Sequence, residues 1–246
     1  MNEQPERAYD DRTSFERAME FLEVGEQFLA IAYTDIAGFS ARVHHEQKTN
    51  GLSSAFKLKE EVDRLLRPSF DTNAAYLKTL GDGCLYLYKD MDAPFHHAVD
   101  TQTKLRDFYK SRTDLDPLQV RIGIHAGWVK IVAERVLDRL NKDGFGDAMN
   151  LADRVAASCT PGSIRFTEDY RKAVTERSGS QSLSHWPAAK DIGPVKFRGR
   201  PDRCHLWEVS VGPQAKSAAT KGDLIALGIG GPLGLVAKRV FDKMRS

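Results

Sequence analysis

A buried strand that ends in one carboxylate constrains this chain more than any other feature of its sequence. Residues 28–34 (FLAIAYT) are mostly apolar, Asp35 follows them, and Gly38 then permits a turn. Burying an unpaired carboxylate is unfavourable, because the charge loses its contact with water. The position suits a divalent cation, since magnesium binds one or two carboxylates together with substrate phosphates. A helix cap for the segment that begins near Gly38 is the alternative interpretation of Asp35.

A second carboxylate lies in a predicted hairpin. Two largely apolar runs, residues 75–80 and 84–88, flank Gly81-Asp82-Gly83, a pattern that predicts antiparallel strands joined by a tight turn. Aspartate is common in turns, so Asp82 alone is weak evidence for a site. Two carboxylates held near each other repel unless a cation lies between them. Asp35 and Asp82 together therefore predict a shared metal site.

Three further segments complete an ordered set of motifs. They are residues 120–127 (VRIGIHAG), 143–154 (DGFGDAMNLADR) and 192–199 (IGPVKFRG). In order and spacing, the five segments resemble the class III nucleotidyl cyclases, the adenylate and guanylate cyclase catalytic domain. The resemblance covers about residues 28–210. It implies an α+β fold with a ferredoxin-like βαββαβ core, in which helices pack on an antiparallel sheet.

The resemblance assigns a metal site and a catalytic pair. Asp35, Asp82 and the backbone carbonyl of Ile36 would bind two divalent cations, Mn²⁺ or Mg²⁺. Asn150 would orient the ribose of a nucleoside triphosphate, and Arg154 would stabilise the transition state, because a guanidinium fits phosphate oxygens. These two residues are four apart and share one helix face.

Two positions bear on which base is bound. Lys78 and Asp143 match the pair that contacts adenine in adenylate cyclases of this family. Lysine only donates and an ionised aspartate only accepts, which complements the ring nitrogen and amino group of adenine. Conversion of ATP to cAMP is therefore favoured, and the carbonyl of guanine would repel Asp143. Cytosine also presents an amino group beside an acceptor, so a pyrimidine cyclase of a bacterial anti-phage system, making cUMP or cCMP, is the alternative.

The chain departs from the usual family pattern at two positions near the expected site. Trp128 follows Gly127 where a smaller residue is usual, and would narrow the pocket in favour of a pyrimidine. Asp153 lies beside Arg154 and would pair with it. A surface salt bridge with Asp147 or Asp153 is the structural alternative for Arg154. A catalytically silent cyclase-homology domain is the second alternative function, although both metal aspartates and the arginine are present.

The family's site is shared between two protomers, and this chain carries both sets of residues. We therefore expect a homodimer with two equivalent sites, whose product is read by an unknown cyclic-nucleotide receptor. The net charge of +2 gives no indication of nucleic-acid binding. The three cysteines are far apart, and the polar N-terminus lacks the apolar core of a signal peptide, so we expect a cytoplasmic protein.

Length and composition predict one large domain with two appendages. Residues 1–27 are expected to form an N-terminal extension with a short helix over Thr13–Val24, residues 28–210 the catalytic domain, and residues 211–246 a C-terminal tail. The uncharged stretch 224–237 of this tail is shorter than the roughly 20 residues that span a bilayer. It is expected to fold back onto the domain or to contact a partner or a membrane weakly.

Periodicity and turn signals predict the remaining elements. Five helices are expected: after Asp35 to about His45, over Ser53–Arg67, from Asp92 to about Lys110, over Ala148–Ser158 and after a Thr167 cap. Two short strands are expected on either side of Gly127, over Val120–His125 and Val129–Ala133. Three further strands are expected over Ser163–Phe166, Lys190–Phe197 and Arg203–Val209. His125 falls in an apolar strand and is expected to be a hydrogen-bonded core histidine. The pairs His44-His45 and His96-His97 are expected to be solvated.

Overall fold

The computed structural model describes most of the predicted catalytic domain. The described residues are 22–54, 56, 57, 60, 66, 74–80, 83–110, 118–136, 139–179, 186 and 188–211, with the backbone alone at 74–80, 134–136, 139–141 and 178. The elements are β1 (Gly25–Ile36), α2 (Phe39–Asn50), β2 (Ala74–Leu80), β3 (Gly83–Tyr88), α4 (Ala93–Lys110), β4 (Val120–Val136), β5 (Arg139–Phe145), α5 (Asp147–Ser158), β6 (Ser163–Thr167), α6 (Glu168–Ser178), β7 (Lys190–Lys196) and β8 (Arg203–Ser210). The terminal extension up to residue 21 and the tail from residue 212 lie outside the described residues.

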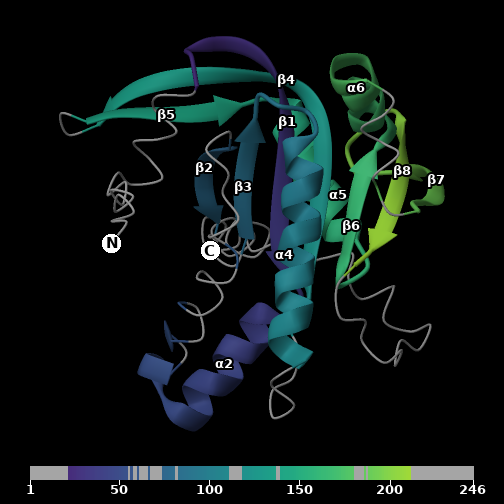
Figure 1. The fold of residues 1–246 in the computed structure, drawn as a ribbon. Coiled ribbons are helices and arrows are strands. Elements are labelled where there is room, and N and C mark those ends of the chain that lie inside the picture. Colours follow the sequence, from purple (N-terminus) through teal and green to yellow (C-terminus); the bar gives the residue numbers. More distant parts are fainter. Residues whose placement is uncertain are drawn as a thin grey trace, which may run out of the picture. The chain divides into compact units, whose positions relative to one another are not determined.

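The sheet confirms the ferredoxin-like core. Its strand order is β2-β3-β1-β4-β6-β8-β7, and β5 pairs with β4 (Figure 1). The first four strands, with α2 and α4 between them in the chain, give βαββαβ with β1 and β3 in the centre and antiparallel neighbours throughout. Among the described pairs, β4 with β6 is parallel and extends the core toward β8 and β7.

The two faces of the sheet are covered by different helices. Side chains alternate between faces along a strand, so neighbours in sequence enter different cores. One core joins Ala30 and Ala32 of β1 to Phe95 and Leu105 of α4, and Figure 1 shows α4 running along this face of the sheet. The opposite face packs on α5: its members are Leu29, Ile31, Leu85, Leu87, Val129, Ile131, Ala148 and Ala152, with Leu22. Asp35 belongs to the α5 face, since it lies an even number of residues from Leu29.

Two glycines of β4 allow α5 to lie directly on the sheet. A Cβ on Gly123 would be 2.2 Å from the Ala156 nitrogen, and one on Gly127 would be 2.7 Å from the Ala148 Cβ. The prediction of two short strands separated at Gly127 was wrong, because β4 runs unbroken from Val120 to Val136. Gly127 is required for the close approach of a helix and does not end a strand.

Several local predictions are confirmed, and one histidine is corrected. The Thr167 side chain caps α6 by accepting from the Tyr170 amide, as expected. Helix α2 continues to Asn50, beyond the predicted end near His45, and Gly51 with a φ of 87° is its C-cap. The prediction that His97 is solvated was wrong. Its Nδ1 lies 2.6 Å from the Tyr88 hydroxyl, and burial lowers its pKa to about 4. His96 is exposed, as expected.

Two segments differ from the expected elements. Strand β5, residues 139–145, was expected only from Asp143, where the strand-to-helix motif 143–154 begins, and it pairs with the outer half of β4 to form an arm (Figure 1). Residues 22–24, which were expected to end an N-terminal helix, are not helical and lead directly into β1. Of the helix expected over 53–67, the described residues 53, 54, 56, 57, 60 and 66 are helical. No helix among the described residues is long and apolar enough to cross a membrane.

Candidate active site

Asp35 lies at the end of the central strand β1 and forms an ion pair with Arg121. Antiparallel pairing of β1 with β4 places Asp35 opposite Arg121. The Arg121 Nη1 donates to the Asp35 carboxylate over 3.2 Å, and the side chains of Arg121 and Asp35 are 20% and 29% exposed, respectively. Asp35 does not cap α2: the N-cap is Gly38, with a φ of 73° and no side-chain cap bond. The carboxylate is therefore paired with Arg121 and still partly accessible, as a ligand for a cation must be.

The hairpin that carries Asp82 is bound to the same end of β1. Thr34 pairs with Cys84, and its hydroxyl accepts a hydrogen bond from the Cys84 amide over 3.1 Å. A Cβ on Gly83 would lie 2.7 Å from the Thr34 carbonyl oxygen, so glycine is needed for this close approach. Asp82 directly precedes Gly83 and lies outside the described residues. Its role as a metal ligand stays a prediction, supported by the position of the strand that follows it.

The Ile36 carbonyl is directed toward this hairpin. Hydrogen-bonding groups of successive strand residues point to opposite edges. Because the Ala37 amide donates to Gln119 next to β4, the carbonyl of Ile36 faces the other edge, where β3 begins. Carboxylate and carbonyl oxygens are the ligands that Mg²⁺ and Mn²⁺ prefer, so the predicted set fits these cations. Within the described ranges, no three His, Cys, Asp or Glu side chains form a metal-binding group, and the set therefore depends on Asp82.

The N-terminus of α2 is a feature that the sequence analysis missed. The helix starts four residues after Asp35, its cap lacks a side-chain hydrogen bond, and its first turn contains no acidic residue. The first N–H groups of a helix and its dipole favour a bound anion such as a phosphate. The signal in the sequence was Gly38 at the cap position, where a serine, threonine or aspartate would have satisfied these donors internally.

Asn150 and Arg154 lie on α5, as predicted. Among the described contacts, Arg154 forms neither of the two salt bridges that were the structural alternative, with Asp147 or with Asp153. Asn150 is exposed. The Arg154 Nη1 donates to the carbonyl oxygen of Arg198 over 2.7 Å. Asp147 forms its ion pair with Arg200 instead.

Asp153 precedes Arg154 on α5, and the pKa of its carboxyl is raised. Burial raises the pKa of its carboxyl, the charge of Asp35 raises this pKa further, and Arg154 has a smaller opposite effect. Consecutive helix residues point about 100° apart. The guanidinium of Arg154 points toward the turn between β7 and β8, where its Nη1 donates to the Arg198 carbonyl.

The two residues expected to contact the base lie on different strands. Asp143 is exposed on β5, and its carboxylate accepts a hydrogen bond from the Gly144 amide over 2.9 Å. Lys78 lies on β2 opposite Leu85, just after a register shift, and its side chain is outside the described part. Their joint role in base recognition stays a prediction.

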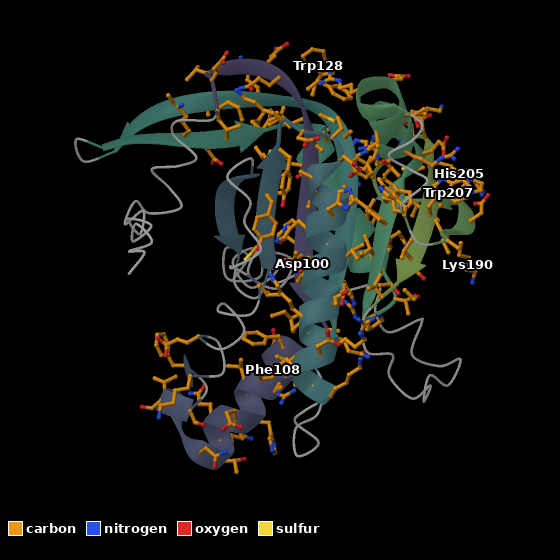
Figure 2. All side chains as sticks on the ribbon, viewed as in Figure 1. Asp100, Phe108, Trp128, Lys190, His205 and Trp207 are labelled. Carbon is orange, nitrogen blue, oxygen red and sulfur yellow. The ribbon has the colours of Figure 1, made fainter. Side chains whose placement is uncertain are left out.

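Trp128 and His125 lie on opposite faces of β4. Trp128, labelled in Figure 2, is 64% exposed. Its ring contacts Phe28 edge to face, with 5.7 Å between ring centroids. The register puts Trp128 on the face opposite Asp35, so within one chain it does not narrow the space around that carboxylate. His125 is the core histidine that was expected: its Nδ1 is 2.9 Å from the Thr167 hydroxyl, and burial lowers its pKa to about 4.

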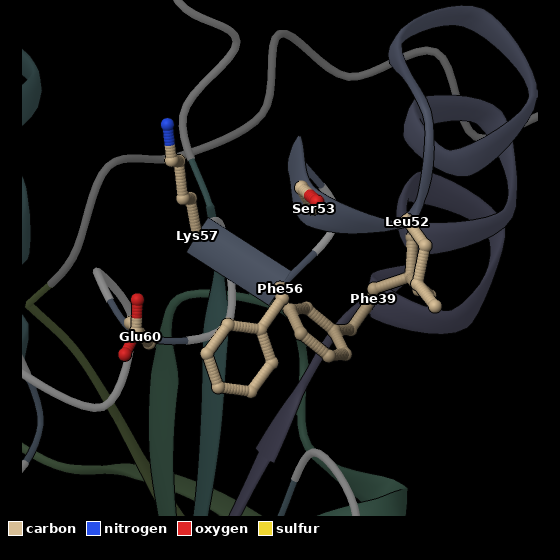
Figure 3. A pocket seen from close by; sticks show the side chains of 7 residues that line it. Phe39, Leu52, Ser53, Phe56, Lys57 and Glu60 are labelled. Atoms are coloured by element: carbon tan, nitrogen blue, oxygen red, sulfur yellow. The ribbon is translucent and has the colours of Figure 1, made fainter.

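An open apolar groove lies beside helix α2. Its volume is about 580 Å³, and Figure 3 shows it between α2 and the segment that follows this helix. Its lining consists of Phe39, Val43, Leu52, Ser53, Phe56, Lys57 and Glu60. None of the seven predicted site residues is among them, and Phe39, the first residue of α2, is where the groove borders the N-terminus of that helix.

Comparison with known proteins identifies the family. The model of the adenylate and guanylate cyclase catalytic domain matches residues 25–203. A serine/threonine-protein kinase of Myxococcus xanthus is 23% identical over 74% of this chain and 20% of its own length. A pH-sensitive adenylate cyclase of Mycobacterium tuberculosis is 26% identical over 76% of this chain and 42% of its own. The chain thus spans less than half of either curated relative.

A solved structure shows the same fold. The structure of adenylate cyclases from Trypanosoma brucei in their monomeric state superposes with a TM-score of 0.61 at 18% identity, covering 80% of this chain and 94% of the other. The family model covers β1, the hairpin of β2 and β3, β4 and α5. The chain belongs to the family of adenylate and guanylate cyclase catalytic domains.

Proposed function

We propose that this chain is a nucleotidyl cyclase that converts a nucleoside triphosphate to the 3′,5′-cyclic monophosphate and pyrophosphate, with ATP as the favoured substrate. The observation that carries the proposal is the accessible carboxylate of Asp35 at the end of β1, next to the start of the hairpin strand β3. Asp35 caps no helix, and its one described side-chain contact is the ion pair with Arg121. Family membership supports the same activity.

The reaction forms one bond and breaks one. The ribose 3′ oxygen loses its proton and attacks the α-phosphorus, while the bond from this phosphorus to the bridging oxygen breaks and pyrophosphate leaves with the electron pair. Charge develops on the α-phosphate and on the leaving group, so catalysis depends on positioning and on positive groups.

Residues of the chain would provide both the positioning of the substrate and the positive groups. Asp35, Asp82 and the Ile36 carbonyl would hold two divalent cations, Mn²⁺ or Mg²⁺. When bound, such ions activate the hydroxyl and neutralise phosphate charge. The first N–H groups of α2 would donate to phosphate oxygens. Arg154 would donate to the α-phosphate in the transition state, and Asn150 would hold the ribose for in-line attack.

The proposed preference for ATP rests on Lys78 and Asp143. Lysine would donate to a ring nitrogen of adenine, and Asp143 would accept from the amino group. GTP would set a carbonyl against Asp143 and leave two acceptors facing each other. A pyrimidine substrate was suggested by Trp128, but that side chain lies on the face opposite Asp35. ATP is ranked first on Lys78 and Asp143 alone, and cCMP or cUMP is the alternative product.

We further propose that two copies of the chain form each site. Within one chain, the described contact of Arg154 is the Arg198 carbonyl, and that of Asp35 is Arg121. A second copy in a two-fold arrangement would bring its Asn150 and Arg154 to the first copy's Asp35 and complete two equivalent sites.

A product assay tests the activity. Purified protein is incubated with ATP, GTP, CTP and UTP separately in Mn²⁺, and the products are resolved by mass spectrometry. Cyclic AMP as the main product is the expected result. Cyclic CMP or cyclic UMP would refute the assignment of Lys78 and Asp143 and support the anti-phage alternative. Nucleotide binding without cyclic product, with protein that is folded and dimeric, would support a silent cyclase-homology domain instead.

A further inference from the structure

The turn between β7 and β8 has a conformation that only a few residues permit. The Arg200 amide donates to the Phe197 carbonyl over 3.2 Å, which closes a four-residue turn. Gly199 occupies its third position with a φ of 77°, as a type II turn requires. Phe197 is 8% exposed and packs with Leu151 and Val155 of α5. The turn is therefore fixed against the helix that carries Arg154.

The type of turn sets the direction of one carbonyl. Types I and II differ by a rotation of about 150° in ψ of the second residue, which reverses the central peptide group. That residue is Arg198, and its carbonyl accepts the hydrogen bond from Arg154 Nη1. The Arg154 Nη2 lies 4.0 Å from the position of a Cβ on Gly199. A type I turn would point this carbonyl away from the guanidinium.

A second contact joins the turn to the start of α5. Arg200 forms an ion pair with Asp147, the first residue of the helix. Asn150 lies in sequence between Asp147 and Arg154, so the contacts of the turn lie on both sides of it. The turn thus contacts α5 through Arg198 and Arg200 and through the packed ring of Phe197.

We propose that the turn 197–200 positions the guanidinium of Arg154 for catalysis, with Gly199 as the positioning residue that sets the direction of the Arg198 carbonyl. This inference rests on the proposed cyclase activity. A guanidinium has five N–H donors, so one bond to the carbonyl leaves donors for phosphate oxygens. Fixing a long side chain before the substrate binds reduces the reorganisation that the transition state would otherwise require.

The test compares two glycines with the same backbone requirement. Gly199→Ala introduces a side chain at a φ of 77°, and the matched control Gly193→Ala does so at a φ of 80° in the same hairpin, with nothing within 4 Å of the added Cβ. Gly199→Ala should lower kcat about 10- to 100-fold and change KM less than about threefold, because it removes a contact that serves the transition state. Gly193→Ala should keep kcat within about twofold. Equal losses of kcat in the two variants would overturn the proposal.

A second readout does not depend on turnover. Nitrogen NMR of the guanidinium groups, assigned with Arg154→Lys, should show slow rotation of the Arg154 guanidinium in the wild-type protein and in Gly193→Ala, and faster rotation in Gly199→Ala. An unchanged Arg154 signal in Gly199→Ala would refute the positioning role even if the protein makes no cyclic nucleotide. Absence of product from the wild-type protein would refute the proposed function and leave this measurement to decide the positioning role.

A conservative variant guards against loss of folding. Asparagine tolerates positive φ better than alanine does, so Gly199→Asn should recover part of the kcat that Gly199→Ala loses. Gly199→Asn with the same kcat as Gly199→Ala, at equal thermal stability, would contradict the argument from turn type.

Discussion

Replacing Gly123 by alanine tests how α5 is held on the sheet. A Cβ at this position would lie 2.2 Å from the Ala156 nitrogen and 2.5 Å from the Ala152 carbonyl oxygen. Both are backbone atoms of α5, so no change of rotamer can relieve the overlap. The helix must move away from β4, and Asn150 and Arg154 must move with it.

The size of the effect follows from these distances. Comfortable contacts between non-bonded heavy atoms are about 3.5 Å, so α5 must retreat by more than about 1 Å. Overpacking of this kind costs about 1–3 kcal/mol, and occasionally more. We expect the upper end of this range, about 3 kcal/mol, because the added Cβ has no rotamers and the atoms it meets belong to the backbone of α5. In a chain of this length that corresponds to a fall in Tm of about 6–12 °C.

Urea unfolding and thermal melts of Gly123→Ala measure the effect, with Gly127→Ala for comparison. The Cβ added at Gly127 would meet the Ala148 Cβ at 2.7 Å, a milder overlap with a side chain, so its loss of stability should be smaller. A shift of about 1 Å in the helix that bears catalytic groups can cost on the order of 100-fold in rate. Cyclic-nucleotide production by folded Gly123→Ala should fall accordingly. Gly123→Ala as stable as the wild type, or more stable than Gly127→Ala, would refute this account of the packing.

Two further predictions concern the dependence of stability on pH and the ion pair of Asp35 at the end of β1. Burial lowers the pKa of His125 to about 4 from 6.5, so the unfolded chain binds more protons than the folded one between these values, and stability falls as the pH decreases through this window. His125→Asn should make the dependence of the urea midpoint on pH shallower between pH 4 and about 6.5, with pH 8 as the reference; an unchanged slope would show that His125 does not titrate in this way. Arg121→Met removes the cation paired with Asp35 and should lower stability by about 1 kcal/mol in metal-free buffer. Added Mn²⁺ should then raise the Tm of Arg121→Met more than that of the wild type, and equal shifts would argue against a metal at Asp35.

The fold could be predicted where local sequence patterns decide the structure. Two signals lie within a few neighbouring residues of the sequence: the apolar run before Asp35 and the hairpin pattern around Asp82. The strands of both segments are present as expected. Gly127 was misinterpreted for the same reason. Its role depends on α5, which packs on the strand from 20 residues later in the chain, and a local window cannot distinguish a break from a close approach.

The contacts around the candidate site were less predictable. His97 was expected to be solvated because it lies beside His96, yet it faces Tyr86 and Tyr88 of β3. Strand β5 has little apolar alternation, and it is stabilised by pairing with the extended end of β4. The contact of Arg154 is made by a backbone carbonyl 44 residues away, and a carbonyl leaves no trace in the amino-acid sequence.

The central claim is that Asp35 of one copy and Arg154 of another serve one reaction. Its most direct test measures cyclic nucleotide produced by Asp35→Ala, by Arg154→Ala and by an equal mixture of the two after exchange of subunits. Each variant alone should be inactive. In the mixture half of the dimers are heterodimers, each with one intact site, so activity should return to about a quarter of the wild-type value. An inactive mixture, in which heterodimers are shown to form, would contradict the shared site.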